Sequence, residues 1–422
     1  MSEWRETRLG DVCQHITVGH VGKMSDQYTD DGVCFLRSQD VRPFRVDLQG
    51  AKRVAPDFHR RLRKSALQAD DVVVVRTGYP GTAAVIPPDA PELNCADLVV
   101  IRPGPTLDPW FVASHFNSTH GRASVSGSLV GSAQQHFNVG VAADTRLLLP
   151  PLRIQSRVAG VLRAFDELIE INERRIELLE DLARSLYREW FVRFRFPGHE
   201  DTKFVDSELG PMPEEWGVLA AGSALLPVGG GTPSKKRAEY WSAGSIPWFT
   251  PSDLTRGRRR HVVRSETAIT PRGLAESGAK VFPAGSVLMT SRATLGVLAI
   301  AEMDSTCNQG FIVIPPTDGI PATFIFEWLS HRSDELETIA TGATFKEITK
   351  TAFKRFPFTR PDVHTLAAFS RLTDPIEEEI AVAESHNRRL AATRDLLLAR
   401  LVTGRLDISD IDLGELLPAR AA

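Results

Sequence analysis

The chain has 422 residues, of which 50 are Lys or Arg and 53 are Asp or Glu, so its formal net charge is −3. This length corresponds to two or three domains, and the near-balanced charge argues against a uniformly basic nucleic-acid-binding protein while leaving room for a local basic patch. The 42% hydrophobic and 24% charged residues are typical of a folded globular protein and exclude wholesale disorder.

The sequence carries none of the usual marks of export or membrane insertion. No apolar run reaches the ~18 residues of a membrane span, and the first ten residues contain no apolar signal core. The four cysteines are scattered without a CxxC pair (Cys13, Cys34, Cys95, Cys307). We therefore expect a cytoplasmic protein without a membrane partner, a disulfide framework or a metal site.

The charge is unevenly distributed along the chain. Residues 1–150 are neutral, 151–215 carry −4, 216–361 carry +5 and 362–422 carry −4. Two acidic segments thus alternate with a neutral and a basic one.

Residues 1–150 are predicted to form a globular domain with substantial sheet. Short β-type runs at Val72–Val75 and Val99–Ile101 are separated by Gly and Pro turns. Such punctuation is typical of a mixed α/β domain.

Residues 151–197 are predicted to form one long helix. Apolar residues recur every three or four positions, which is the spacing of a helical stripe: Val158, Val161, Phe165, Ile169, Ile176, Leu179, Leu182, Leu186 and Trp190. Pro150–Pro151 precedes this helix and Pro197–Gly198 lies beyond its end. Some 40 residues at ~1.5 Å each would span roughly 60 Å.

Residues 198–361 are predicted to form a linker and a second globular domain. Its β-type runs are Val287–Met289 and Phe311–Ile314, again bounded by turn residues. Residues 362–422 then contain a second long helix, from about Leu366 to Val402, and a tail. Its stripe comprises Phe369, Leu372, Ile376, Ile380, Ala383, Leu390, Leu397 and Leu401. Pro375 falls inside this pattern and predicts a kink near its start.

Each stripe contains one Asn, Asn172 in the first and Asn387 in the second. A buried Asn in a coiled-coil seam fixes the register of the helices at some cost in stability, and the alternative is that these side chains face water. Helices this long and acidic are not the core of one domain. We interpret them as an antiparallel intramolecular coiled coil that joins and separates the globular domains.

The chain repeats itself at an offset of about 211–215 residues. Segment 35–41 matches 248–254, segment 69–78 matches 284–293, and segment 98–103 matches 311–316. The order globular–helix–globular–helix therefore predicts a mixed α/β (α+β) fold in a duplicated, pseudo-two-fold arrangement. Two related readers held apart would suit two half-sites of a DNA duplex separated by unread base pairs.

The motifs of common catalytic sites are missing from the sequence. It contains no Walker loop, no GxGxxG after a strand, no HExxH and no metal-spaced Cys/His set. Gly229–Gly231 lacks the Lys-Ser/Thr and helix of a phosphate loop, and we interpret it as a tight loop. Methyltransferase and nuclease motifs are likewise absent, so we expect no catalytic residues.

Candidate DNA contacts are densest in the second globular domain. Arginines and lysines there would neutralise phosphates, or alternatively belong to solvated loops: Lys235, Lys236, Arg237, Arg256, Arg258, Arg259, Arg260 and Arg264. Arg292 could contact a guanine edge, and Asn308 and Gln309 an adenine edge, unless they cap turns. The remaining candidates are Thr232, Ser234, Tyr240, Ser291, Thr294, Thr344 and Lys346. Tyr240 could equally serve in packing.

The first globular domain offers a thinner set of contacts. Its basic cluster comprises Lys52, Arg53, Arg60, Arg61, Arg63 and Lys64, with Arg60 and Arg61 the preferred phosphate contacts. The loop positions that match those of the second domain are Arg37, Ser38, Arg76, Thr77, Gln134, Gln135 and His136. His136 could equally make a structural hydrogen bond.

These residues resemble the specificity subunit of a type I restriction–modification enzyme. The resemblance lies in Gly231–Ser234, Tyr240–Trp241, Ile246–Trp248 with Ser252–Leu254, Arg292–Thr294, Asn308–Gly310 and 340–348, which are similar to the family's target recognition domain. Ile169–Asn172 and Leu401–Leu406 resemble its helical regions, so the likeness extends over essentially the whole chain. The first half departs from the pattern, with Gly19–Gly22 and Cys95–Asp97 where the second half has Gly-Thr-Pro and Asn-Gln-Gly.

The resemblance implies a non-catalytic subunit that binds double-stranded DNA and reads a split target, one half per recognition domain, through the major groove. It also implies that the helices set the spacer and dock two methyltransferase subunits. Those partners, not this chain, would bind S-adenosylmethionine, and a translocase–nuclease subunit would join for restriction.

Two other functions are compatible with parts of the sequence. A coiled-coil adaptor could keep the fold without sequence-specific DNA reading. An enzyme with a fused methyltransferase or nuclease would need the cofactor and carboxylate motifs that the sequence lacks.

Overall fold

The computed structural model describes residues 4–129, 137–257, 259–317, 319–342 and 346–408. The chain divides into two compact units, which we call the first unit (Met1–Glu170 with Arg388–Ala422) and the second unit (Ile171–Asn387). Each unit therefore contains one globular part and a segment of both long helices. Within the described residues, no helix is long and apolar enough to span a membrane.

The globular part of the first unit is built on two sheets. The larger has the order β10 (Ala83–Val85), β9 (Val72–Val75), β12 (Leu98–Pro103), β2 (Cys13–Val18). The smaller has the order β3 (Tyr28–Thr29), β7 (Lys52–Val54), β4 (Val33–Leu36), β11 (Leu93–Cys95), β8 (Ala66–Leu67). Two antiparallel strand pairs complete this part: β1 (Arg5–Arg8) with β13 (Arg146–Leu149), and β5 (Val41–Arg42) with β6 (Arg45–Val46). The short helices are α1 (Leu9–Val12), α2 (Pro56–Arg61), α3 (Pro109–Asn117), α4 (Thr119–Leu129) and α5 (Val139–Asp144).

The core of this part includes the strands that the short β-type runs predict. Every residue of Val72–Val75 is buried, as expected for a strand that is covered on both faces. Helix α3 begins with Pro109 after Asp108, whose carboxylate accepts hydrogen bonds from two backbone N–H groups of the first turn. Its apolar residues then pack against the larger sheet.

The second unit repeats this topology. Its larger sheet has the order β17 (Val228–Gly229), β24 (Phe311–Ile314), β21 (Val287–Thr290), β22 (Leu298–Ala301), β19 (His261–Val262), and its smaller sheet the order β20 (Thr267–Ile269), β18 (Ile246–Phe249), β23 (Thr306–Cys307). The strand pairs are β14 (Phe204–Ser207) with β15 (Gly210–Pro213), and β16 (Gly217–Ala220) with β25 (Pro357–Arg360). Its short helices are α7 (Ala221–Ala224), α8 (Pro251–Thr255), α9 (Pro271–Ala275), α10 (Ala322–His331), α11 (Ser333–Thr338) and α12 (Lys350–Arg355).

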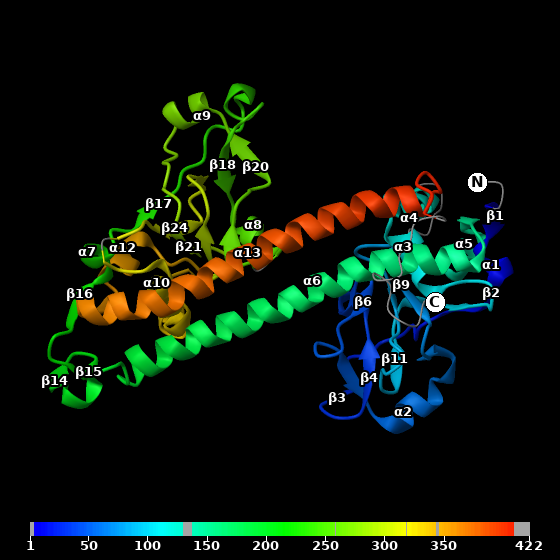
Figure 1. Cartoon of the computed structure of the whole chain (residues 1–422), viewed down its shortest axis with the longest axis horizontal. Helices are drawn as coiled ribbons and strands as arrows, with labels where there is room; N and C mark the ends of the chain where they lie inside the picture. The colour runs from blue at the N-terminus through cyan, green and yellow to red at the C-terminus, as the bar shows by residue number, and fades with distance from the viewer. Residues whose placement is uncertain (1–3, 130–136, 258, 318, 343–345, 409–422) are drawn as a thin grey trace. The chain divides into compact units, whose positions relative to one another are not determined.

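The two units share part of their strand order, which agrees with the predicted internal repeat. Strands β2, β12, β9 and β10 match β17, β24, β21 and β22 in sheet order, and the parallel pair β4–β11 matches the parallel pair β18–β23. In each unit the smaller sheet projects away from the long helices (Figure 1).

The two long helices are α6 (Leu152–Tyr187) and α13 (Val363–Leu401), as the apolar stripes predict. Helix α6 continues as a π-helical turn, Arg188–Val192. Pro375 lies inside helix α13, which is assigned as one continuous helix. Within the second unit the helices run antiparallel, because the Asn172 amide donates to Asn387 (2.8 Å) while Arg175 pairs with Glu379 (2.5 Å).

The contact seam between the helices differs from the predicted stripe at two positions. Leu182 and Leu372 are 47% and 48% exposed, whereas Ala183 and Thr373 are fully buried. A helical repeat of about 3.6 residues leaves adjacent positions hard to distinguish by spacing alone, and the small residue takes the crowded position. In the second unit Ala183 packs with Ile376 and Ile380. The Asn172–Asn387 hydrogen bond places both amides at this seam.

Candidate DNA-binding interface

Four loops that the sequence singled out meet at one edge of the second unit's larger sheet. The Ser291 N–H donates to the Gly310 carbonyl (2.8 Å), and the Ile348 N–H donates to the Ser291 carbonyl (3.0 Å). The Gly231 N–H donates to the Cys307 carbonyl (2.9 Å). Backbone hydrogen bonds therefore bring together segments that lie up to 117 residues apart in the sequence, as the numbering shows.

The glycine run has a packing role at this edge. A Cβ on Gly230 would collide with the carbonyl oxygens of Cys307 and Asn308, and a Cβ on Gly231 would collide with the backbone of Gly278. The prediction of a tight loop is thus confirmed, because only glycine permits so close a backbone approach.

Polar side chains from several loops lie at the shared edge. The Thr232 hydroxyl donates to the Gln309 amide oxygen (2.7 Å), which orients that amide. Arg292 pairs with Glu347 (2.8 Å) while half of its side chain remains exposed. Lys346, which precedes Glu347 in the sequence, is exposed. The surface thus combines an oriented amide with two cations, groups that bind base edges and phosphates.

The loop that carries Arg292 is held in a fixed shape. Ala293 and Gly296 adopt left-handed backbone angles (φ 63° and 73°), and the Gly296 N–H donates to the Thr290 carbonyl (2.9 Å). Arg292 and Thr294 are exposed on this loop. A rigid loop at the end of a buried strand can hold an arginine fork in a defined direction.

Sequence reasoning missed a residue in the matching loop of the first unit. Gly78 and Gly81 have left-handed angles (φ 83° and 88°), and the Gly81 N–H donates to the Val75 carbonyl (3.0 Å), as in the second unit. Tyr79 lies at the tip of this loop and is 85% exposed. The Gly-Tyr-Pro-Gly turn was the available signal, because turn residues around an aromatic side chain favour its presentation at the surface.

Two of the predicted contacts have buried side chains. Ser291 is 3% exposed at the end of β21. Tyr240 is also 3% exposed, and its hydroxyl donates to Glu276 (2.7 Å). Asn308 is half-buried and accepts the Gly310 N–H (2.8 Å) through its side-chain oxygen, so it shapes the turn beside Gln309. Packing and turn formation therefore account for these three residues.

The arginine run after α8 is not a continuous phosphate-binding strip. Arg256 forms an exposed pair with Glu266 (2.6 Å), and Arg260 is buried against carboxylates. Arg259 and Arg264 are exposed, and Arg258 lies outside the described residues. Earlier in the same unit, Ser234, Lys235 and Lys236 are all exposed, as phosphate contact requires.

In the first unit, the predicted loop residues are held by acidic neighbours. Arg37 binds Asp40 through two of its nitrogens (2.8 Å each), and this hydrogen bonding raises the pKa of Arg37. Arg76 pairs with Asp97 (2.6 Å) and donates to the Phe137 carbonyl (2.9 Å). The side chains of Arg37 and Arg76 are only 21% and 15% exposed, against 51% for Arg292, so these two arginines organise the loops.

The other first-unit candidates are half-buried, lie on α2 or fall outside the described residues. Ser38 is half-buried, and Thr77 is half-buried with its hydroxyl 3.4 Å from Asp97. Arg60 pairs with Asp57 on α2, and Arg61 lies over the Phe58 ring with its guanidinium 5.4 Å from the centroid. Four candidates lie outside the described residues: Gln134, Gln135, His136 and, in the second unit, Thr344.

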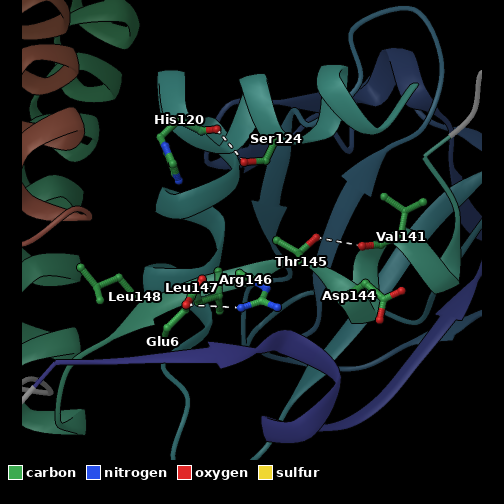
Figure 2. Close-up of a pocket in the computed structure, with 9 residues that line it drawn as sticks. All are labelled: Glu6, His120, Ser124, Val141, Asp144, Thr145, Arg146, Leu147 and Leu148. Carbon is green, nitrogen blue, oxygen red and sulfur yellow. Dashed lines mark hydrogen bonds and ion pairs between the residues drawn. The ribbon is translucent and has the colours of Figure 1, made fainter. Parts of the chain in front are cut away.

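An open cleft in the first unit has no part in this interface (Figure 2). Its lining includes Glu6, which pairs with Arg146 (3.3 Å), and Asp144, which pairs with Arg8. His120 is exposed at its border. Because the cleft's charged groups neutralise one another, the geometry gives it no evident ligand.

The described residues show no group of three or more His, Cys, Asp or Glu side chains arranged to hold a metal ion. Burial raises the pKa of the Cys13 and Cys307 thiols to about 12, and it also raises that of Cys95. Thiols held protonated in this way are poor nucleophiles.

Comparison with known proteins finds relatives that are similar to parts or most of this chain. The profile described as "Type I restriction modification DNA specificity domain" matches residues 213–382, which include all four loops of the second-unit edge. The type I restriction enzyme MjaIX specificity subunit of Methanocaldococcus jannaschii is 35% identical over 177 residues. That match covers 41% of this chain and only 40% of the relative.

Two longer matches extend over nearly the whole chain. The putative type I restriction enzyme MjaX specificity subunit of the same organism is 22% identical over 419 residues, 96% of this chain and 94% of the relative. The crystal structure of a type I restriction–modification system S subunit from M. genitalium is 13% identical, with a TM-score of 0.56 over 94% of this chain and 96% of that one. At that identity the structural likeness shows the fold alone.

Proposed function

We propose that this chain, like the type I restriction–modification specificity subunits that it resembles, reads a bipartite DNA target for such a complex. Each unit recognises one half-site, and the base pairs between the half-sites are left unread. The chain itself performs no catalysis. It acts in the cytoplasm, where the DNA is.

The observation that carries this proposal is the shared edge in the second unit. Arg292 and the Thr232–Gln309 pair lie on loops joined by backbone hydrogen bonds, within the segment that the family profile matches. Arginine and glutamine are the side chains that pair with guanine and adenine in the major groove. Lys346, Lys235 and Lys236 supply phosphate contacts around them.

The duplicated topology supports two readers rather than one. Four strands of the larger sheets share their order in the two units, while the loop tips differ, with Tyr79 at the position of the Arg292 loop. A pseudo-two-fold coiled-coil arrangement of such units would match the two-fold symmetry of a duplex backbone. Different loop tips would recognise different base sequences in the two half-sites.

The long helices are the proposed docking surface for two methyltransferase subunits. Ile171, Leu178 and Leu182 lie on one face of α6 and are 63%, 64% and 47% exposed. Exposed apolar side chains on one helical face, flanked by acidic residues, are typical of a protein contact. The partners would bind S-adenosylmethionine and methylate adenine, and a translocase–nuclease subunit would join for restriction.

The proposal is tested with the complex reconstituted from the full chain and its methyltransferase subunits. Arg292→Ala should weaken binding of the target by ~1–3 kcal/mol and relax base preference in one half-site only. Arg272→Ala is the matched control, because Arg272 also forms an exposed ion pair (2.8 Å to Glu276) in the second unit but lies on α9. The control should bind and discriminate as the unaltered complex does.

Competition with duplexes altered in one half-site at a time provides the measurement. Unchanged discrimination by Arg292→Ala in both half-sites would contradict the assignment of the reading edge. If scrambling either half-site left the affinity of the unaltered complex unchanged, the adaptor function without DNA reading would be favoured instead.

A further inference from the structure

A single carboxylate of helix α13 holds two backbone groups of the second globular part. One oxygen of Glu384 accepts the Arg260 N–H (2.9 Å), and the other accepts the His261 N–H (3.0 Å). Glu384, Arg260 and His261 are only 5%, 3% and 7% exposed. Two charge-assisted hydrogen bonds from adjacent residues fix both the position and the direction of this chain segment on the helix.

Two further carboxylates bind the side chains of the same two residues. Glu377, two helical turns before Glu384, accepts hydrogen bonds from Arg260 and His261 (3.0 Å each). Glu327 of α10 binds the other side of the Arg260 guanidinium (2.8 Å). We call Arg260, His261, Glu327, Glu377 and Glu384 the carboxylate clamp.

The electrostatics of the clamp are strongly coupled. Burial alone would raise the pKa of Glu377, but the hydrogen bonds and charges of His261 and Arg260 outweigh it and lower this pKa to about 2. The Arg260 guanidinium also lies over the Phe326 ring, 3.9 Å from its centroid. A buried ionic cluster is a weak source of stability compared with apolar packing, but it tolerates few geometries.

The clamp is connected to the reading edge through two strand pairings. Residues His261–Val262 form β19, and His261 lies opposite Ile300 of β22. Leu298 of β22 lies opposite Met289 of β21, and the Arg292 loop follows β21 directly. Helix α13 is thereby joined to the reading loop across three hydrogen-bonded strands.

The first unit attaches the same sheet edge with different chemistry. Phe44 bridges Ala84 of β10, the strand that corresponds to β22, and is 4% exposed. The Arg394 guanidinium of α13 lies 5.4 Å from the Phe44 ring centroid and pairs with Asp166 of α6 (2.5 Å). Here the helix supplies the cation, whereas in the second unit the loop supplies it. In each unit, the residue that pairs with this strand, His261 or Phe44, is thus held by the long helices.

We propose that the carboxylate clamp consists of positioning residues that fix the second recognition sheet on α13 and so restrict the spacer length that the complex accepts. This rests on the proposed function, since it assigns a role in split-site reading to residues that touch no DNA. The clamp orients the Arg292 loop but does not select its bases. Weakening the clamp therefore changes the tolerated distance between half-sites and leaves each half-site's sequence preference intact.

The test uses the reconstituted complex and a set of duplexes with both half-sites intact and the spacer lengthened or shortened one base pair at a time. Glu384→Gln removes one acceptor from the backbone pair while preserving size. Glu378→Gln, an exposed neighbour on the same helix, is the charge-matched control. Arg260→Lys is the second variant, because it retains the charge but loses the forked hydrogen bonds, should Glu384→Gln fail to fold.

We expect the unaltered complex and Glu378→Gln to prefer one spacer strongly. The clamp variant should reduce that preference about tenfold or more, with base preferences in both half-sites unchanged. A folded clamp variant with the original spacer profile would overturn the proposal, and so would one that loses base preference in the second half-site. If the unaltered complex depended on neither half-site nor spacing, the proposed function itself would fail, a distinct outcome.

Discussion

Replacing Arg260 with Met should be among the most destabilising single changes in the second unit. The guanidinium is 1% exposed and is surrounded by Glu327 and Glu377, which are 2% and 12% exposed. Its removal leaves these carboxylates buried without their cation, a loss that typically costs about 3–5 kcal/mol. His261 and Arg260 together lower the pKa of Glu377 to about 2, so the loss of Arg260 removes one of the two groups that keep this carboxylate charged.

The measurement is urea unfolding of the full chain followed by tryptophan fluorescence. Five of the seven tryptophans lie in the second unit (Trp190, Trp216, Trp241, Trp248, Trp328). With a slope of ~2–3 kcal/mol per molar urea, the midpoint of their transition should fall by about 1–2 M. Arg256→Met, in the same arginine run but with an exposed partner, should cost less than about 1 kcal/mol.

The pH dependence provides a second check on the same variant. Because the Glu377 pKa is lower in the folded than in the unfolded chain, its contribution is complete above pH ~4.5 and is lost as the pH falls towards ~2. The difference between the original chain and Arg260→Met should therefore shrink on acidification. A loss below about 1 kcal/mol at pH 7, or one that does not vary with pH, would refute the electrostatic reasoning.

Three further predictions concern other parts of the chain. Burial outweighs the charge of Arg394 and raises the pKa of Asp166 to about 6. The free energy of unfolding of the first unit should therefore fall by about 3 kcal/mol as the pH rises from ~4 through ~6. Asp166→Asn should abolish this pH dependence, as measured by urea unfolding at about pH 4.5 and about pH 7.5. Asn172→Leu alone should cost ~1–3 kcal/mol because the Asn387 amide loses its partner, whereas the double Leu variant should raise the thermal midpoint; a destabilised double variant would argue against the seam position. Tyr79→Ala should weaken DNA binding by ~1–3 kcal/mol and alter base selectivity in one half-site, while Arg292→Ala alters it in the other half-site. If both variants changed selectivity in the same half-site, the idea of two separate readers would be contradicted.

The long helices were the most predictable part of the fold. Continuous 3–4 spacing without Gly or Pro, apart from Gly160, located α6 to within a few residues. The spacing could not decide between Leu182 and Ala183 for the buried seam, since that depends on how closely α13 approaches. Sequence matches at one offset also predicted the shared sheet topology, because strand order is a property of the whole repeated unit.

The candidate site was less predictable, and the arginines explain why. Arg260 sits in a run that looks like a solvated basic loop, yet its partners Glu377 and Glu384 lie more than a hundred residues away. Arg76 and Asp97, or Arg292 and Glu347, are likewise paired only by the fold. Local sequence reveals charge but not its neutralisation, which requires the tertiary contacts.

The central claim is that this chain directs a complex to a split DNA target. It is tested most directly by mapping methyladenine across the source genome by long-read sequencing, with and without the gene for this chain. The account predicts a methylated motif made of two specific halves and a fixed unread spacer, present in the first genome and lost in the second. A continuous motif, or methylation that persists unchanged after the deletion, would contradict it.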